Sequence, residues 1–540
     1  MLFGPPDKSQ LSDASYSAYQ KQPTGGCQEK EVALMRRTTV VLGLVLALLV
    51  AFGVVGVATA ADTTDTSALR NAVSVEGIMK HENAFQKIAN SNGGTRVSGS
   101  PGYDASAAYV KRQLKAAGYT VTKQKFTYPF FQELTPTTFS RTAPPPGRAY
   151  VRDRDFNIMG YSGSGNLVDA QVVPTNDIQI PPGATANSSH SGCEASDFVD
   201  VTSVTEDRVA LIQRGGSSAG GTVGCNFRTK ALNAQAAGYD AAIVFNEGQP
   251  TRTGLIGGGL SGLGVNIPVL MTTFAVGEEL YNLDKASPGS VRVSISADTI
   301  AEQRTTSNVI ADYPDGRTDR TLIVGAHLDS VPEGPGINDN GSGAAGILEI
   351  ALQMKKLGIQ PTNHVRFAFW GAEESGPPQW GSQHYVDQLG EPDQPRLEDI
   401  ALYLNFDMIG SPNYVRFVYD GASQGPDPGS VQIETVFNDY FGSQGLDTEP
   451  TPLDGRSDYQ AFLNAGIPAG GATSGSDGIK TPEQATLYGG TAGKPYDPCY
   501  HKSCDTIDNL NPKSIDELAD GAAHATLTFA QTTSAVNGTN

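Results

Sequence analysis

The chain has 540 residues, of which 18% are charged, and its formal net charge is −19. With 62 glycines and 33 prolines, this composition is typical of a loop-rich globular protein and excludes a coiled coil or a disordered chain. Because phosphate binding needs clustered Lys and Arg, and no such cluster is present, we expect no nucleic-acid partner. The length is sufficient for more than one domain.

The N-terminal region has the pattern of an export signal. Arg36 and Arg37 precede an apolar run over residues 40–57, which ends in the small-residue sequence 58–60. We therefore predict an N-terminal extension plus signal peptide over residues 1–61. The mature protein is expected to be secreted and monomeric, without stable membrane association. An uncleaved membrane anchor is the alternative, because the apolar run is long for a signal peptide.

The cysteines agree with export. Loss of the leader would remove Cys27 and leave four cysteines, which allow three pairings. Cys499 and Cys504 would close a short loop, and Cys193 and Cys225 a longer one, so we favour these two disulfides.

The predicted elements begin with helices between residues 67 and 118, where apolar residues recur at helical spacing. Residues 119–131 alternate aromatic or β-branched side chains with Lys and Gln, which predicts a strand. Residues 135–165 are turn-rich, with three consecutive prolines at 144–146, and predict a crossing between domains.

Two regions of strands follow. Residues 166–300 combine short strands with one helix and predict a small α/β insert; the strands are expected over 171–173, 209–213, 241–245, 269–272 and 291–295, and the helix over 226–237. From residue 307 onward strands and helices alternate, which predicts a mainly parallel sheet with helices on both faces. The strands of this region are expected over 321–326, 364–370 and 402–407, and a helix over 341–357.

Each of three apolar strands in the second region is followed by side chains that can bind a metal ion. These are His327 and Asp329 after the first strand, Glu373 and Glu374 after the second, and Asp407 after the third. Ligands bind at the carboxyl ends of strands in an open α/β sheet, so we expect these residues to meet at one edge. A His-x-Asp pair also lets the imidazole bind a metal while the carboxylate orients it.

Two loops add to this set. Asp339 lies in the glycine-rich turn 336–343, and His501 lies between Cys499 and Cys504. Two imidazoles and three carboxylates can form two zinc sites that share one carboxylate and leave a position open for water. Paired metal ions polarise a carbonyl and activate bound water, and a carboxylate that is not a ligand can take the proton.

Residues 324–407, together with His501, resemble the M28 family of co-catalytic metallo-aminopeptidases. The resemblance continues through Gly455-Arg456-Ser457-Asp458 and residues 488–493 to Cys499-Tyr500-His501, and is greatest to small secreted actinobacterial aminopeptidases. It implies a secreted enzyme that removes N-terminal residues from peptides or proteins, with a preference for large apolar residues such as leucine.

The resemblance also implies the role of each site residue. A hydroxide bound by two zinc ions would be the nucleophile, and the ions would be held by His327, Asp339, Glu374, Asp407 and His501, with Asp339 bridging. Glu373 would be the general base, Tyr500 would stabilise the tetrahedral intermediate, Asp329 would orient His327, and Arg456 would shape the substrate site. Asp516 and Asp520 match a calcium site of those relatives, although two acids one helical turn apart are equally expected on a solvated face.

The insert resembles a protease-associated (PA) domain through residues 209–215 and 225–238. Such domains lie beside exopeptidase active sites and carry no catalytic residues. The predicted organisation is therefore a leader (1–61), the first part of a peptidase domain (62–150), an inserted PA domain (151–303) and the second part of the peptidase domain (304–535). The fold class is α/β: a mainly parallel mixed sheet flanked by helices, of the zinc-exopeptidase (phosphorylase/hydrolase-like) type, with a small α/β insert.

Other functions remain open at this point. An M28-type carboxypeptidase would need basic residues that bind the terminal carboxylate of its substrate. A glutaminyl cyclase works with one zinc ion, and Asp339, as a bridging ligand, counts against it. A non-catalytic peptide-binding protein would not need the full ligand set together with Glu373.

Overall fold

A computed structural model describes residues 64–202, 204–216, 225–392, 394–425 and 427–532. The predicted leader, with Cys27 and the apolar run, lies outside the described residues. Within the described part, every helix is too short or too polar to cross a membrane.

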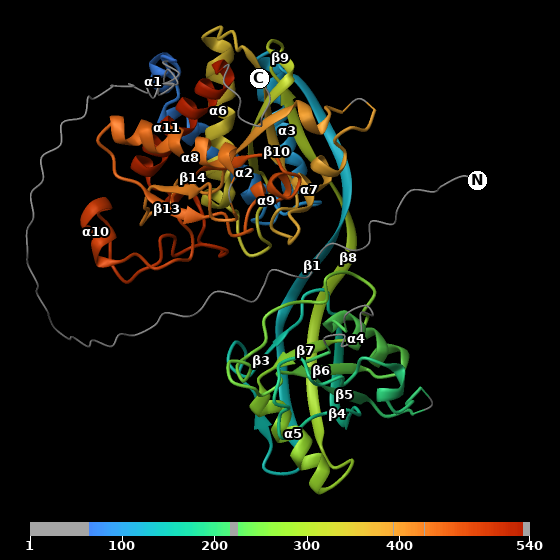
Figure 1. Ribbon diagram of the computed structural model, residues 1–540. Coiled ribbons are helices and arrows are strands. Elements are labelled where there is room, and N and C mark those ends of the chain that lie inside the picture. The colour runs from blue at the N-terminus through green and yellow to red at the C-terminus, as the bar shows by residue number, and fades with distance from the viewer. Residues whose placement is uncertain (1–63, 203, 217–224, 393, 426, 533–540) are drawn as a thin grey trace, which may run out of the picture. The chain divides into compact units, whose positions relative to one another are not determined.

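The strands between residues 317 and 473 form the mostly parallel half of one hydrogen-bonded sheet (Figure 1). Their order from the outer edge inward is β13, β12, β14, β11, β9, β10. Neighbours are parallel except for β12 against β14. The bounds are β9 (Arg317–His327), β10 (Asn363–Trp370), β11 (Ile400–Phe406), β12 (Phe417–Asp420), β13 (Glu449–Pro452) and β14 (Ala469–Thr473).

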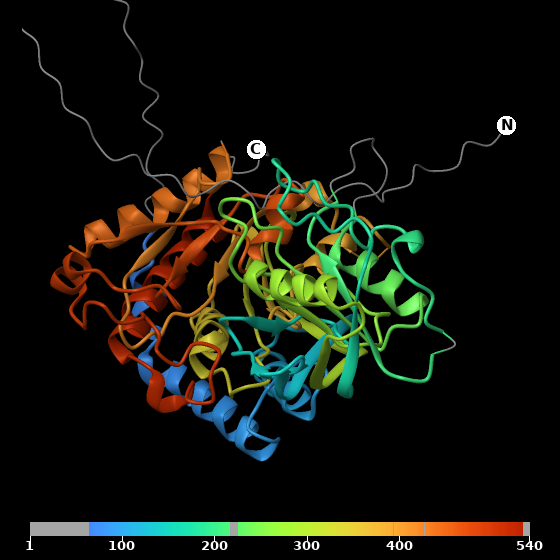
Figure 2. The same cartoon turned by 90° about the horizontal axis from the view of Figure 1, so that it is seen from below.

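Helices cover both faces of these strands, because successive side chains of a strand point to opposite sides. On β9, Leu322 and Val324 join the larger core and Ile323 joins a second core on the other face. The larger core is covered by α1 (Ser67–Ala72), α2 (Val75–Ser91), α3 (Pro101–Ala116), α6 (Gly343–Lys356), α8 (Pro428–Ser443) and α11 (Pro512–Gln531). The second face carries α7 (Trp380–Asp387) and α9 (Tyr459–Asn464). The α1 helix contacts α11, so the N-terminal helices (blue) and the last helix (red) lie together in Figures 1 and 2.

The insert has a smaller sheet with a helix on each face. Strands β4 to β7 are parallel, and β3 is antiparallel to β7. Helix α5 packs on the face that includes Leu211 and Ile243, and α4 packs on the opposite face, with Ile212 and Val244. The bounds are β3 (Phe156–Ile158), β4 (Gly165–Pro174), β5 (Arg208–Gln213), α4 (Phe227–Ala236), β6 (Ala241–Phe245), β7 (Val269–Thr272) and α5 (Phe274–Ala286).

Two long strands connect the halves. β1 (Thr120–Ala143) and β8 (Arg292–Asp312) pair antiparallel along their lengths, and β8 also pairs with β10 and with β4 (Figure 1). The prediction of a turn-rich crossing from residue 135 was wrong for residues 135–143, which continue β1. Their backbone groups find partners on β8, and Phe139 is buried in the insert core, so pairing overrides the local turn signals. The predicted α/β fold class with an inserted small domain is confirmed.

The packing of α5 on β6 generates a stability prediction. A Cβ added at Gly277 would lie 2.0 Å from Phe245 Cγ, so Gly277→Ala should lower the free energy of unfolding by about 1–3 kcal/mol. Gly442 in α8 has nothing within 4 Å of an added Cβ, so Gly442→Ala should raise it by about 0.5–1 kcal/mol. Urea unfolding of both variants measures the difference. A Gly277→Ala variant as stable as the parent would show that α5 moves freely on the sheet.

Candidate active site

The five predicted metal ligands meet at the carboxyl edge of the parallel strands. His327 ends β9, Glu374 follows β10 and Asp407 follows β11, while Asp339 lies in the short turn η2 (Ile337–Ser342) that leads into α6. His501 reaches them from the loop between Cys499 and Cys504.

Asp339 stands between two groups of donor atoms. His327 Nε2 is 3.3 Å from Asp339 Oδ1 and 3.3 Å from Asp407 Oδ1. His501 Nε2 is 3.2 Å from Asp339 Oδ2 and 3.1 Å from Glu374 Oε2. Asp339 therefore belongs to both of the metal-capable clusters found among the described residues.

The donor set fits zinc. Both imidazoles point Nε2 at carboxylate oxygens, and each cluster combines one histidine with two carboxylates, which leaves a position open around a four-coordinate ion. None of the described residues forms a hydrogen bond with the buried Oε1 of Glu374 or Oδ1 of Asp407, although His327 Nε2 lies 3.3 Å from the latter. Such oxygens are costly to bury unless something positive binds them.

Charge repulsion and burial together perturb this site. Burial raises the pKa of Glu374 to about 7, and the negative charge of Asp339 acts in the same direction. Burial also raises the pKa of Glu373 well above its usual value, and Glu374 adds to the shift. For His501 burial favours the neutral form, but Glu374 and Asp339 outweigh it and raise the pKa to about 11. The residues thus concentrate negative charge that divalent cations would neutralise.

Two further side chains contact the predicted ligands and the turn that carries Glu373. Asp329 Oδ1 lies 3.6 Å from His327 Nδ1 and accepts a hydrogen bond from the Glu373 amide at 3.3 Å. The hydroxyl of Ser457 donates to Asp407 Oδ2 at 2.6 Å, which leaves Oδ1 facing His327. Sequence reasoning found Asp329 but did not assign Ser457 a role, although it lies in the motif that contains Arg456.

A buried acidic pair that sequence reasoning missed holds the Asp339 turn. The carboxylate of Asp505 accepts the amides of Asn338 and Asp339 at 2.9 and 3.0 Å. Asp497 accepts from Asn338 Nδ2 at 2.7 Å, and Asn509 donates to both carboxylates. Asp497 and Asp505 flank the Cys499–Cys504 disulfide, so one clamped loop positions His501 and also braces Asp339. The sequence signal that could have indicated this acidic pair was an Asp on each side of the two cysteines.

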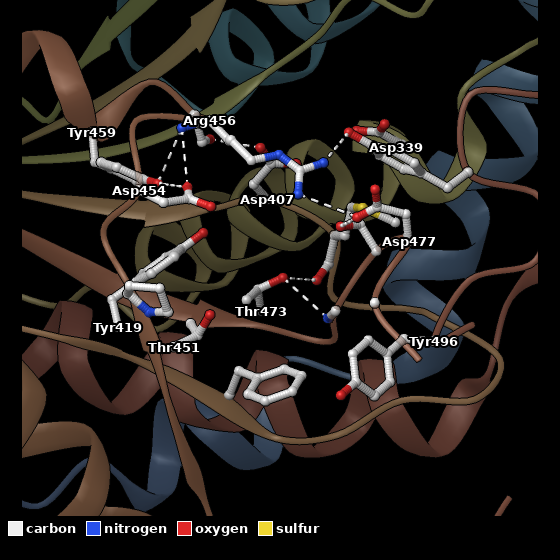
Figure 3. A pocket seen from close by; sticks show the side chains of 18 of the residues that line it. Asp339, Asp407, Tyr419, Thr451, Asp454, Arg456, Tyr459, Thr473, Asp477 and Tyr496 are labelled. Atoms are coloured by element: carbon white, nitrogen blue, oxygen red, sulfur yellow. Dashed lines mark hydrogen bonds and ion pairs between the residues drawn. The ribbon is translucent and has the colours of Figure 1, made fainter. Parts of the chain in front are cut away.

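A cavity of about 450 Å³ opens beside the metal-capable clusters (Figure 3). Aromatic and other apolar side chains line it, among them Met408, Phe417, Tyr419, Tyr459 and Tyr496. Arg456 Nη1 lies 3.2 Å from Asp477 Oδ1, and Nη2 donates to the Tyr500 hydroxyl at 3.3 Å. The Tyr500 ring stacks on His501 at 3.9 Å between centroids. Arg456 therefore contacts both Asp477 and the Tyr500 hydroxyl, two residues of the cavity lining.

The remaining predicted residues lie elsewhere. Asp516 and Asp520 are one turn apart on α11, where Asp520 accepts from the Tyr440 hydroxyl at 3.4 Å. Neither acid belongs to a metal-capable cluster of the described residues. The second predicted disulfide, Cys193–Cys225, is present in the insert.

Two histidines and three carboxylates gathered at the carboxyl edge of a parallel sheet, next to a cavity, form the arrangement of a metallohydrolase. The model of peptidase family M28 matches residues 308–526, and the PA domain model matches residues 168–280. An aminopeptidase of Pseudomonas aeruginosa is 40% identical over 479 residues, covering 87% of this chain and 83% of that one. The chain belongs to peptidase family M28, and the prediction of a metallo-aminopeptidase is confirmed.

Other relatives match over a similar share of this chain. The probable lipoprotein aminopeptidase LpqL of Mycobacterium tuberculosis is 38% identical over 489 residues, covering 87% of this chain and 88% of that one. Leucine aminopeptidase 2 of Trichophyton equinum is 35% identical over 455 residues, covering 83% and 82%. The aminopeptidase from Aneurinibacillus sp. strain AM-1 shares the fold, with a TM-score of 0.60 at 23% identity over 85% of this chain and 95% of that one.

The bracing of Asp339 generates a prediction about metal retention. Asp505→Ala leaves the amides of Asn338 and Asp339 without their acceptors, so zinc affinity should fall by about 10- to 100-fold. Asp508→Ala, an exposed change in the same loop, is the matched control and should bind zinc like the parent. Competition with a chromogenic chelator measures both affinities. Equal affinities for the two variants would contradict the bracing role.

Proposed function

We propose that this chain removes the N-terminal residue of peptides with two zinc ions, held by His327, Asp339, Glu374, Asp407 and His501, with Asp339 bridging. The observation that carries the proposal is the position of Asp339, whose two oxygens face the two histidines at 3.3 and 3.2 Å. Zinc ions bound there would polarise the scissile carbonyl and lower the pKa of bound water. The chain's own residues would orient the substrate and transfer the proton.

The cavity suits the first side chain of a substrate. Apolar side chains among its lining, including Met408 and Phe417, would contact a large apolar residue, and we propose leucine as a preferred one. The carboxylates of Glu373 and Asp407 line the same cavity and can receive a free α-amine. The relatives from Pseudomonas aeruginosa and Mycobacterium tuberculosis are named aminopeptidases, and the relative from Trichophyton equinum is named a leucine aminopeptidase. These names support the choice of leucine.

Glu373 is the proposed general base. It is 8% exposed, and none of the described Lys or Arg side chains forms an ion pair with it. Burial raises the pKa of the Glu373 carboxyl, which makes its carboxylate a stronger base for taking a proton from bound water and passing it to the leaving amine. The Tyr500 hydroxyl, held by Arg456, would donate to the developing oxyanion, and Asp329 would keep His327 in position.

We also propose that the mature enzyme is a secreted monomer from which residues 1–61 are removed; retention of this segment as a membrane anchor is the alternative. The proposed boundaries are 62–150 and 304–535 for the peptidase domain and 151–303 for the PA domain. Calcium binding at Asp516 and Asp520 stays a prediction.

The aminopeptidase specificity is tested with leucine p-nitroanilide and its N-acetylated analogue. Only the free-amine substrate should be cleaved, because the carboxylates of the cavity bind an α-amine. Cleavage should be lost on chelation and restored by zinc, and metal analysis should find two zinc ions per chain. Cleavage of the blocked substrate, or full activity with one zinc ion, would favour a different M28 activity.

The general-base role is tested with Glu373→Gln, which keeps the side-chain size but removes the proton acceptor. The turnover number kcat should fall by about 100-fold or more while zinc content stays unchanged. Glu333→Gln, an exposed change after β9, is the control and should keep the parental kcat. A Glu373→Gln variant with more than a tenth of the parental kcat would rule out this base.

A further inference from the structure

The turn after β10 carries both Glu373 and Glu374, and its first amides are held by the peptidase domain. Asn308 Oδ1 accepts from the Gly371 amide at 3.1 Å, and Ser98 Oγ accepts from the Ala372 amide at 2.6 Å. Asp329 accepts from the Glu373 amide. Each of these contacts precedes Glu374 along the chain.

The other end of the turn is held through a carbonyl. The Ser375 carbonyl oxygen accepts from Trp380 Nε1 at 3.2 Å and from the Tyr161 hydroxyl at 3.1 Å. Trp380 begins α7 in the peptidase domain, whereas Tyr161 follows β3 of the insert. The Tyr161 side chain of the insert thus donates a hydrogen bond to the residue that directly follows Glu374.

Tyr161 is anchored firmly within the insert. On its N-terminal side, the Met159 amide donates to the Val269 carbonyl at 2.9 Å; on its C-terminal side, the Gly163 amide donates to the Ile267 carbonyl at 3.0 Å. Its own backbone has a φ of 66°, a left-handed conformation that is unfavourable for tyrosine and that directs the chain out of the strand. The ring packs against Phe131 of β1, with centroids 6.0 Å apart.

Aromatic side chains also pack between strand β1 and the turn that carries Glu373 and Glu374. Phe126, Tyr128 and Phe130 of β1 form a small core with Ala372, and Trp380 packs against it. The long β1–β8 pair that carries the insert therefore passes directly beside the turn with the two glutamates. A shift of the insert would be transmitted to Ser375 through Tyr161.

We propose that Tyr161 is a positioning residue, through which the inserted PA domain fixes the turn that carries Glu373 and Glu374. The inference rests on the proposed roles of these glutamates as base and zinc ligand. Without the hydroxyl, the Ser375 carbonyl keeps one donor, and the following peptide units gain freedom to rotate. Catalysis is sensitive to such shifts, because misplacement of a reacting group by about 1 Å can cost about 100-fold in rate.

The test compares Tyr161→Phe with Tyr150→Phe. Both changes remove one hydroxyl on the insert side of the chain; that of Tyr150 donates to Glu279 at 3.3 Å and does not contact the turn. Tyr161→Phe should lower kcat by about tenfold with KM within twofold of the parent, and should speed the loss of zinc to a chelator several-fold. Tyr150→Phe should match the parent in all three measurements.

Two outcomes would overturn the proposal. One is parental kcat and zinc loss in Tyr161→Phe, and the other is an equal loss in Tyr150→Phe, which would indicate a general effect of the insert on stability. Glu373→Gln, assayed beside them, separates this failure from failure of the proposed function. If Glu373→Gln is inactive and Tyr161→Phe is normal, only the positioning role fails.

Discussion

Carboxylates buried close together repel one another, and the active site brings several of them to one edge of a sheet. Asp339, Glu374 and Asp407 lie with two imidazoles in clusters whose donor atoms are within 4.8 Å of one another. Without cations, burial and mutual repulsion raise the pKa of Glu374 to about 7. The arrangement would be favourable with divalent ions to neutralise this charge, and much of the surrounding structure holds these side chains where such ions could bind.

The supporting contacts follow from that requirement. Three parallel strands end at the same edge, which brings His327, Asp407 and the glutamate turn together. Asp339 comes from an irregular turn, so it needs Asp505 and the disulfide-clamped loop to keep it in place. The same loop supplies His501 and Tyr500, so a single short segment contributes side chains to the site and also holds the Asp339 turn.

The insert is joined to the peptidase domain by a structural ribbon and not by a flexible linker. β1 and β8 continue from the peptidase sheet into the insert sheet, with buried residues at both ends. The Tyr161 contact lies beside this ribbon and reaches the residue after Glu374. An insert without proposed catalytic residues of its own thereby contacts the backbone of the turn that carries Glu373 and Glu374.

Local patterns in the sequence were sufficient to indicate the strand–helix alternation, the strand-end residues His327 and Asp407, and the two cysteine pairs. They succeeded because burial imposes apolar runs, and because ligand-bearing residues follow those runs directly. The length of β1 was not predictable in this way, since residues 135–143 are extended only through pairing with β8, more than 140 residues away. Ser457 and Tyr161 were also beyond reach, because a hydroxyl that contacts a segment distant in the chain has no local periodicity, and Asp505 was marked only by its place beside the cysteine pair. The sequence by itself therefore determined which side chains can do the chemistry, whereas only the tertiary structure decided what holds them in place, because those contacts join segments that are remote in the chain.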